Sequence, residues 1–594
     1  MRRILTVLAL TVLMAAGAVQ LSAGVNPAGR NVDFAFLADD TPGAKATAWL
    51  RTNEVVYDTS VAQGDNDYRA IEVMLDISPN GHIFSKTMFM YIQNATTGEI
   101  RYINVNEGIM EAGQITDYSG NDVEDAVAVS IPDVDDFVVY GDGGQVGPSL
   151  DPAVVSGAMG TGAYQVVLEL RDAAGRNVFQ RFNSRFAIVD SIEAMPLAVD
   201  ADLQLTNDKA YFLNNSTTFV NEGATLSIEP GTYILGLGQT AALVVAQGAK
   251  IEALGSANAP IIFTSAKSVG ERATADWGGL IINGYAQLNV PGGVALGEGD
   301  TGAYGGNDDA DDSGTLRYVR VEFAGTEFSP TNELNGIAFQ GVGSGTTIEY
   351  VQVHQNLDDG VEFFGGNADA KYVYLTGNAD DSLDWTDGWR GRAQFVLIQQ
   401  YTADADNGFE CDNNGDNTEL SPRSNPTIYN ATFVGPGENP IEGDVGLLLK
   451  VGTAVTMKNA IFMGAGEQAV VINGDSSIAQ AQAGNIALTN SIYCNNGTSE
   501  GQANFAVLNN TTAFDIDGFM TAAGSMNRVD EDPELRDPFN LLSPDFRSVK
   551  EGAVTDVNYV AAPPADGFFE PVNFIGAFGP SYDWSAGWTT ACPN

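Results

Sequence analysis

Short runs of alternating apolar and polar residues cover most of this chain of 594 residues. Between about residues 30 and 195 the runs have the length and spacing of antiparallel strands. In YQVVLELRDAAGRNVFQRFNSRFAIVD, residues 164–190, apolar positions alternate, the chain turns at DAAGRN, and the alternation resumes. Strands of this kind predict an Ig-like β-sandwich over residues 24–195.

From residue 196 the pattern becomes a repeat. LSIEPGTYI (226–234) and LVVAQGAKI (243–251) share one apolar pattern. YNATFVG, KNAIFMG and TNSIYCN place Asn430, Asn459 and Asn490 before equivalent apolar triplets. Short strands that recur every 20 to 30 residues are typical of a parallel β-helix, where each coil buries its inner face only by stacking on the next.

These two patterns predict an all-β protein. An N-terminal β-sandwich is followed by a right-handed parallel β-helix, a solenoid, over residues 196–525. Residues 526–594 leave the repeat and are interpreted as a C-terminal capping segment, because an exposed end strand would invite pairing with another chain.

The first residues, MRRILTVLALTVLMAAGAVQLSAG, combine two arginines, an apolar stretch and small residues. This order predicts a secretory signal peptide over residues 1–23. No later run of eighteen apolar residues occurs, so no transmembrane segment is expected. The protein is predicted to be secreted or held on the outer cell surface.

The net charge of the chain limits which partners it can bind. With 76 acidic and 28 basic residues the net charge is −48, which repels nucleic acid and attracts cations. Diffuse acidity would suit salty water, whereas clustered acidity would suit calcium. Two histidines exclude a histidine-rich zinc site. Three distant cysteines, Cys411, Cys494 and Cys592, make no disulfide framework, and their odd number leaves a thiol free or intermolecular.

Several motifs carry a resemblance. APIIFTSAK, DWGGLIING, LDDGVEFFGG, DDSLDWTDGWRG and the closing FIGAFG and WSAGWT are similar to those of a family of secreted bacterial right-handed parallel β-helix proteins with pectate-lyase-like architecture. The resemblance covers roughly residues 197–590. It implies the β-helix fold, but the family has no settled activity, so it implies no particular function.

One acidic motif occurs in three successive coils: NLDDGVE (356–362), NADDSLD (378–384) and DADNGFE (404–410). Stacked strands lie about 4.8 Å apart, so equivalent carboxylates should form columns and repel each other by roughly 3–4 kcal/mol per pair at an effective dielectric of 20. Bound calcium is the predicted remedy. The predicted ligands, termed the acidic ladder, are Asp358, Asp359, Glu362, Asp380, Asp381, Asp384, Asp404, Asp406 and Glu410.

Two loops are further calcium candidates. GGNDDADDSG offers Asp308, Asp309, Asp311 and Asp312, and CDNNGDN offers Asp412, Asn414 and Asp416. Neither completes the EF-hand pattern of ligands, glycine and distal glutamate. Solvated acidic turns are the alternative interpretation for both loops.

Residues of the acidic ladder and its neighbours could also form the active site of an enzyme. A glycoside hydrolase needs two carboxyl groups, for which Asp359 and Asp381 are the candidates, with Trp385 and Trp389 as platforms that stack on sugar rings. A calcium-dependent lyase would use Arg390 or Lys450 as the base. Against both, the ladder repeats nearly unchanged three times, whereas an active site usually breaks its repeat.

The sequence therefore leaves open whether the protein is an enzyme. The favoured interpretation is a non-catalytic, calcium-binding scaffold or adhesive module of the cell surface. Its expected partners are polysaccharide, extracellular matrix or further copies of itself. The alternative is the polysaccharide-degrading enzyme.

Overall fold

The computed structural model of the chain describes residues 31–33, 47–62, 65, 69–71, 73–78, 86–104, 108–109, 129–130, 151–172, 178–329, 332–401, 405–437, 445–497, 503–541, 544–549 and 552–591. The expected signal peptide, Asp404 and Cys592 lie outside these ranges.

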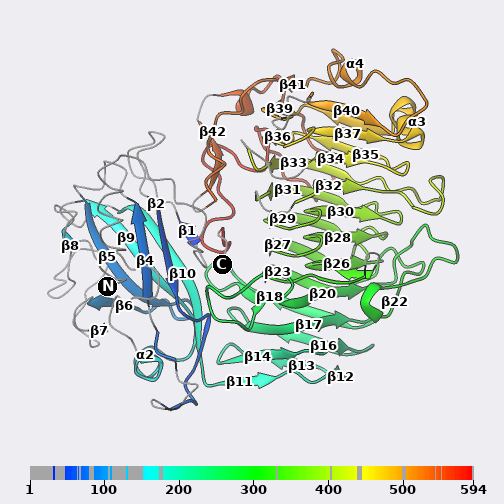
Figure 1. Ribbon diagram of the computed structural model, residues 1–594. Helices are drawn as coiled ribbons and strands as arrows, with labels where there is room; N and C mark the ends of the chain where they lie inside the picture. The colour runs from blue at the N-terminus through cyan, green and yellow to red at the C-terminus, as the bar shows by residue number, and fades with distance from the viewer. Residues whose placement is uncertain are drawn as a thin grey trace.

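The N-terminal part is built on one mixed sheet (Figure 1). Its strands are β1 Asn31–Asp33, β3 Val56–Asp58, β5 Lys86–Asn94, β6 Ile100–Asn104, β7 Gly108–Ile109, β8 Val129–Ser130, β9 Gly162–Asp172 and β10 Val178–Val189. The long antiparallel hairpin β9–β10 is the one that the alternation around DAAGRN predicts. Among the described strands of this sheet, β3 alone runs parallel to its neighbour, β10.

The opposing sheet of the expected sandwich is small among the described residues. It is an antiparallel ribbon of β2 (Thr47–Thr52) and β4 (Val73–Ser78), with β2 beside β10. One helix, α2 (Pro152–Met159), begins at Asp151, whose carboxylate accepts the N–H of Ala153.

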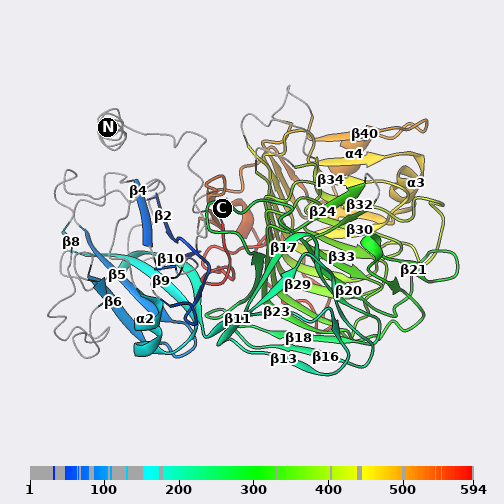
Figure 2. The ribbon, with the colours of Figure 1, turned by 60° about the horizontal axis from the view of Figure 1, so that its bottom comes forward.

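The larger part is a parallel β-helix, which confirms the predicted fold. In the described residues 27 strands, from β11 (Ser191–Ala194) to β41 (Arg528–Val529), form one all-parallel sheet system. The first strand starts five residues before the predicted boundary at 196. Coils stack in chain order along the solenoid axis (Figure 1). Figure 2, turned by 60°, shows the N-terminal sheet beside the solenoid from a second direction.

Each coil contributes strands to two faces. The first face consists of β11, β13 Leu203–Leu205, β14 Lys209–Asn214, β16 Thr225–Ile228, β17 Tyr233–Val245, β18 Lys250–Leu254, β19 Ile261–Ser265, β23 Gly314–Glu322, β27 Thr347–His354, β29 Asp369–Thr376, β31 Arg392–Gln399, β33 Thr427–Val434, β35 Val455–Lys458, β36 Ile461–Met463, β38 Ile486–Thr489, β39 Ile492–Cys494 and β41. The second consists of β12 Ala198–Val199, β15 Thr218–Val220, the end of β17, β20 Trp277–Asn283, β26 Ile337–Gln340, β28 Val361–Phe364, β30 Leu383–Thr386, β32 Asn407–Cys411, β34 Val445–Leu449, β37 Val470–Asn473 and β40 Phe505–Leu508.

From β23 onward, a column of left-handed residues bends the first face at the same place in successive coils. They have φ between 51° and 62° and are Tyr318, Tyr350, Tyr372, Phe395, Asn430, Asn459 and Asn490. Asparagine tolerates this conformation better than most residues, which explains the spaced asparagines of the sequence. The tyrosine rings instead stack on one another, with centroids 4.3 Å and 4.2 Å apart.

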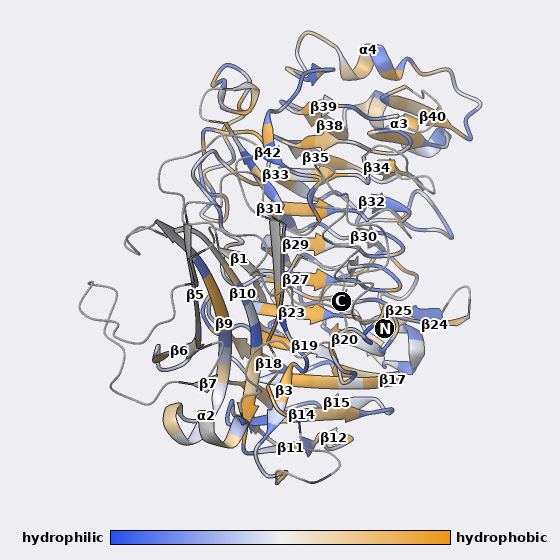
Figure 3. Cartoon of the chain, turned by 60° about the vertical axis from the view of Figure 1, so that its left-hand side comes forward, coloured by the Kyte–Doolittle hydropathy of each residue, from blue (hydrophilic) through white to orange (hydrophobic). Residues whose placement is uncertain are grey.

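The core runs the length of the solenoid, from Met195 to Met520. Inward-facing side chains alternate with outward-facing ones, and Figure 3 shows the stacked strands coloured mainly as hydrophobic. Helix α4 (Ile516–Met520) covers the last coil, because Ile516 and Met520 insert into the core. The other helix of this end, α3 (Asp475–Ala483), follows β37.

Beyond the last coil the C-terminal segment returns along the side of the solenoid. After the ribbon of β42 (Leu535–Asp537) and β43 (Asp545–Ser548), residues 552–591, here called the strap, lie along the first face. Asn490, Asn459 and Asn430 donate from Nδ2 to the carbonyls of Tyr559, Ala561 and Phe574. The strap buries apolar side chains on the outer side of the first face. The end of the solenoid is covered by α4 instead.

Candidate metal centre

The acidic ladder lies on the second face, where three strands share one alternation. In β28, Val361 and Phe363 point into the core and Glu362 points out. The strand register places Glu362 opposite Asp384, and Asp384 opposite Glu410. This pairing confirms the column that the repeated motif predicts.

A second column ties consecutive coils together just before these strands. Asp359 Oδ1 accepts the backbone N–H of Asp381 at 3.1 Å, and Asp381 Oδ1 accepts that of Asn407 at 2.7 Å. Asn356 supports the same turn, since its Nδ2 donates to the Asp359 carbonyl. Each of these aspartates therefore keeps one carboxylate oxygen for the backbone and one for other partners.

The columns bring carboxylates together in four groups, and in each group one oxygen from every residue lies within 4.8 Å of those of the others. Two groups lie toward the turn and two along the strands, and each kind recurs one coil further on. The groups are Asp358, Asp359 and Asp380; Asp380, Asp381 and Asp406; Asp359, Glu362 and Asp384; and Asp381, Asp384 and Glu410. All the donors are hard oxygens, which suits Ca²⁺ or Mg²⁺ rather than softer metals.

Burial and mutual repulsion oppose ionisation of the ladder. Desolvation, followed by the charge of Asp380, raises the pKa of Asp358 to about 8. Desolvation and the charge of Asp406 raise the pKa of Asp380 to about 6. The pKa of Asp359, Glu362, Asp381 and Asp384 is raised well above its usual value by burial and then by neighbouring carboxylates. A divalent cation would relieve both effects.

Asp384 is the clearest sign of a missing partner. Its side chain is 8% exposed, and its buried Oδ1 has no hydrogen-bond partner. Burying a charged oxygen without a partner is costly. Asp384 also belongs to two of the four groups, so its carboxylate lies beside other carboxylates while its Oδ1 has no protein donor.

Residues from distant loops complete the site, and the sequence spacing did not indicate them. Glu298 lies in the 3₁₀ turn η3 (Glu298–Asp300), between the paired strands β21 (Ala295–Leu296) and β22 (Ala303–Tyr304). Glu333 lies in the hairpin of β24 (Thr326–Ser329) and β25 (Asn332–Leu334). Both add negative charge near Asp358. Asn335 Nδ2 donates to Glu362 at 2.6 Å.

The positively charged side chain of Lys450 lies at the other end of the ladder. Lys450 Nζ lies 2.6 Å from a Glu410 oxygen and 3.9 Å from an Asp412 oxygen. Burial disfavours the charge on Lys450, but the carboxylates of Glu410 and Asp412 outweigh it and raise its pKa. Lys450 thus neutralises part of the uppermost coil of the ladder.

The coil architecture agrees with a comparison of sequences. Residues 197–536, more than half of the chain, match the family described as the pectate-lyase like beta helix domain. The chain belongs to this family. No curated protein and no solved structure matches it with significance.

In this pectate-lyase-like protein no helix of the described residues has the length and apolar character needed to cross a membrane. Its two described cysteines, Cys411 and Cys494, are buried free thiols.

The predicted sugar-stacking platforms are wrong. Trp385 and Trp389 are both fully buried in the core of the β-helix. Trp385 follows the inward phase of β30, while Trp389 stacks on Phe363 with ring centroids 4.2 Å apart. Their indole N–H groups donate to Thr453 and to the Ala368 carbonyl, so neither ring presents a face to a ligand.

The first additional acidic loop spreads its carboxylates instead of converging them. Asp309 pairs with Arg390 at 3.0 Å, and Asp312 pairs with Lys250. Asp308 accepts the N–H of Ala310, and Asp311 accepts from Ser313. None of these four carboxylates joins a metal-holding group among the described residues.

In the second loop the side chains hydrogen-bond within the turn or pair with Lys450. Asn414 uses its carbonyl oxygen to accept the N–H groups of Asp416 and Asn417, and its amide donates to Asp387. Asp412 turns away toward Lys450. The alternate spacing that suggested ligands therefore serves an Asn-capped turn.

Proposed function

We propose that this protein is an exported, calcium-binding β-helix scaffold whose acidic ladder holds cations between successive coils. The stabilised solenoid would present its surface to extracellular polysaccharide or matrix, or to further copies of the chain. The signal-like N-terminus and the charge of −48 support export into a calcium-containing medium.

The buried, unpartnered Oδ1 of Asp384 carries this proposal. It lies where carboxylates of two adjacent coils come within 4.8 Å, a separation that costs about 3–4 kcal/mol per ionised pair at an effective dielectric of 20. Calcium accepts six to eight oxygen ligands in flexible geometry, so carboxylates that recur from coil to coil can share a row of ions.

The geometry favours a scaffold over an enzyme. Arg390 is held by Asp309 and by the Gly388 carbonyl. Lys450 is kept protonated by its carboxylate neighbours, so neither candidate base is free to accept a proton. Asp359 and Asp381, the candidate carboxylate pair of a hydrolase, are buried and each binds a backbone N–H of the next coil.

Calorimetric titration with calcium tests the proposal on the mature protein. We expect saturable binding that is lost in the double variant Asp381→Asn/Asp384→Asn, whose amides keep the shape but remove two charges. The matched control is Asp200→Asn/Asp202→Asn. It also removes two charges, and both residues are exposed and accept hydrogen bonds that asparagine preserves.

The control variant should bind calcium like the wild type. Equal binding by both double variants would remove the ladder from consideration, and turnover in a polysaccharide depolymerisation screen would favour the enzyme instead.

A further inference from the structure

Three tyrosines of the bend column form one continuous stack on the first face. Tyr318, Tyr350 and Tyr372 belong to β23, β27 and β29, which are neighbours in the sheet. The rings of Tyr318 and Tyr350 have centroids 4.3 Å apart and planes 12° from parallel. For the rings of Tyr350 and Tyr372 the values are 4.2 Å and 10°. Each phenol therefore lies face to face with the phenol of the next coil.

The backbone at these positions is unfavourable for an aromatic residue. The angle φ is 51° at Tyr318, 55° at Tyr350 and 62° at Tyr372. This left-handed conformation costs free energy in a residue with a bulky side chain, and asparagine takes the equivalent position in later coils. Strain of this kind is concentrated at functional sites, so the three phenols call for a chemical explanation.

Stacking by itself does not require the hydroxyl groups. Phe395 continues the same stack without one, with its ring centroid 5.0 Å from that of Tyr372 and the planes 14° from parallel. The hydroxyl groups add reactivity instead, because a phenol gives an electron and a proton to a one-electron oxidant far more readily than a phenyl ring gives an electron. Two oxidised phenols in contact can then be joined.

Tyr318 and Tyr350 are the accessible pair of the stack. Both are half-buried, and Trp588 of the strap packs edge-on against their rings, with centroids 5.6 Å and 6.1 Å away. Tyr372, by contrast, is 4% exposed, and its hydroxyl donates to Glu570 of the strap at 2.8 Å. A small oxidant can therefore reach the first two phenols, whereas the strap covers and holds the third.

We propose that Tyr318 and Tyr350 are a site of oxidative cross-linking, which forms a dityrosine between two neighbouring coils. Each phenol gives one electron and one proton, and the two phenoxyl radicals form a carbon–carbon bond between their ortho positions. The ring hydrogens at these positions then move to the oxygens, which restores both phenols. The two electrons and two protons are taken by a peroxide; hydrogen peroxide becomes two molecules of water.

The new bond would clamp β23 to β27 covalently. It closes the loop of residues 318–350, so it restricts the unfolded chain and stabilises the folded coils. The proposal does not rest on calcium binding, because the acidic ladder lies on the second face and the tyrosine stack on the first.

Photo-oxidation of the full mature protein at high dilution tests the proposal. The reagents are a ruthenium tris-bipyridyl complex and the peroxide persulfate, which takes the two electrons and becomes two sulfate ions. Trypsin separates the two residues, because it releases residues 318–320 with Tyr318 and residues 321–371 with Tyr350 as the only tyrosine. We expect these peptides to be recovered joined, with a mass lower than their sum by two hydrogen atoms, together with dityrosine fluorescence.

Conservative variants identify the pair. Tyr318→Phe and Tyr350→Phe keep the ring stack, and each should abolish the joined peptides. The matched control is Tyr285→Phe, because Tyr285 is 36% exposed and lies outside the stack. This control should give the joined peptides in the wild-type amount.

Three results would overturn the proposal. One is the absence of the joined peptides from the oxidised wild type. Another is an equal yield from protein oxidised in denaturant, since the folded stack would then not select the pair. The third is a main product that joins residues 321–371 to residues 372–390, because that product would link Tyr350 to a tyrosine other than Tyr318.

Discussion

At the scale of single residues, the ladder shows how position in a strand and burial can work against each other. Asp384 takes an outward position in β30, as an acidic residue should, yet it is only 8% exposed. Neighbouring coils enclose it, and Glu410, Asp412 and Lys450 are its charged neighbours. A carboxylate in that setting either retains a proton or binds a cation.

Because the ladder carboxyls retain protons when no cation is bound, the stability of the metal-free protein should depend on pH. Carboxyl groups such as Asp358, with a pKa of about 8 against 3.8, bind more protons in the folded state than in the unfolded one. Their stabilising contribution is complete below about pH 4 and is lost as the pH rises toward 8. Thermal melting in chelator from pH 4 to 8 should show Tm falling across this range.

Calcium should abolish that loss of stability at neutral pH, because it replaces the protons. A Tm in chelator that rises between pH 4 and 8 would show that the ladder carboxylates are ionised at no cost in the folded protein.

The buried indoles give a second prediction at this scale. Trp389→Ala should lower the free energy of unfolding of the β-helix by about 3–5 kcal/mol, because it leaves a cavity beside Phe363. Denaturation followed by circular dichroism measures it. Tyr285→Ala, at a residue 36% exposed, is the control and should have little effect. Unchanged stability with weakened glycan binding would instead restore the stacking role.

At the scale of elements, the asparagines of the bend column connect the coils to the strap. Asn459 has φ of 55°, donates to the Ala561 carbonyl and accepts the Ala561 N–H, both at 2.8 Å. One side chain therefore satisfies two backbone groups of the strap while its own backbone turns the coil.

Two substitutions separate these roles. Asn459→Gly loses the side-chain bonds but keeps the left-handed conformation, whereas Asn459→Ala loses both, and should be less stable than the glycine variant by about 1 kcal/mol. Both variants should release the strap to limited proteolysis within residues 552–591. Wild-type resistance in both would show that apolar packing alone holds the strap.

At the scale of the whole molecule, a solenoid distributes stability between neighbouring coils. Removing calcium with a chelator should therefore increase amide hydrogen exchange in β28, β30 and β32 and in the coils beside them. The hairpin β9–β10 lies outside the ladder and should keep its protection. Mass spectrometry of exchange measures both regions at once. Equal loss of protection in both would contradict a local role for the ion.

The sequence alone determined the β-helix and the register of the ladder, since these follow from local periodicity. A coil cannot bury its inward face unless equivalent residues stack, so a repeated motif specifies its own neighbours. The positions of Asp359, Asp381 and Glu362 along the columns followed from the same rule.

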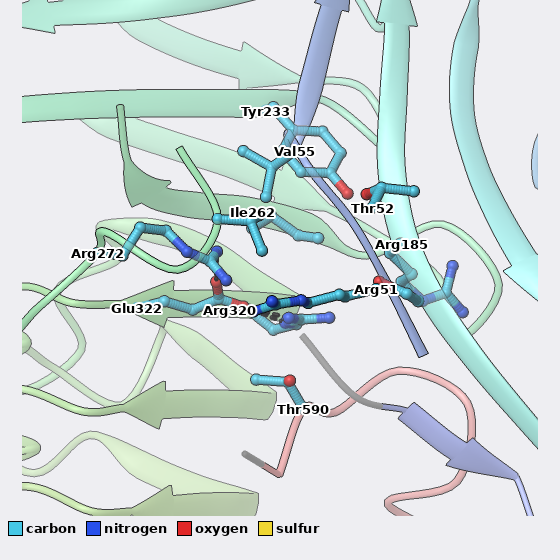
Figure 4. Close-up of a pocket in the computed structure, with 12 residues that line it drawn as sticks. Arg51, Thr52, Val55, Arg185, Tyr233, Ile262, Arg272, Arg320, Glu322 and Thr590 are labelled. Atoms are coloured by element: carbon cyan, nitrogen blue, oxygen red, sulfur yellow. Dashed lines mark hydrogen bonds and ion pairs between the residues drawn. The ribbon is translucent and has the colours of Figure 1, made fainter. Parts of the chain in front are cut away.

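Only the tertiary structure decided which side of the chain each tryptophan faces, where residues 552–591 lie, and what surrounds the ladder. Trp385 and Trp389 could pack inward or outward until the phase of β30 was known. Glu298, Glu333 and Lys450 reach the ladder from loops and strands that no spacing relates to it. Arg51 of β2 and Arg320 of β23 likewise line one pocket although they come from two parts of the chain (Figure 4), because long-range packing, not local pattern, sets such neighbours.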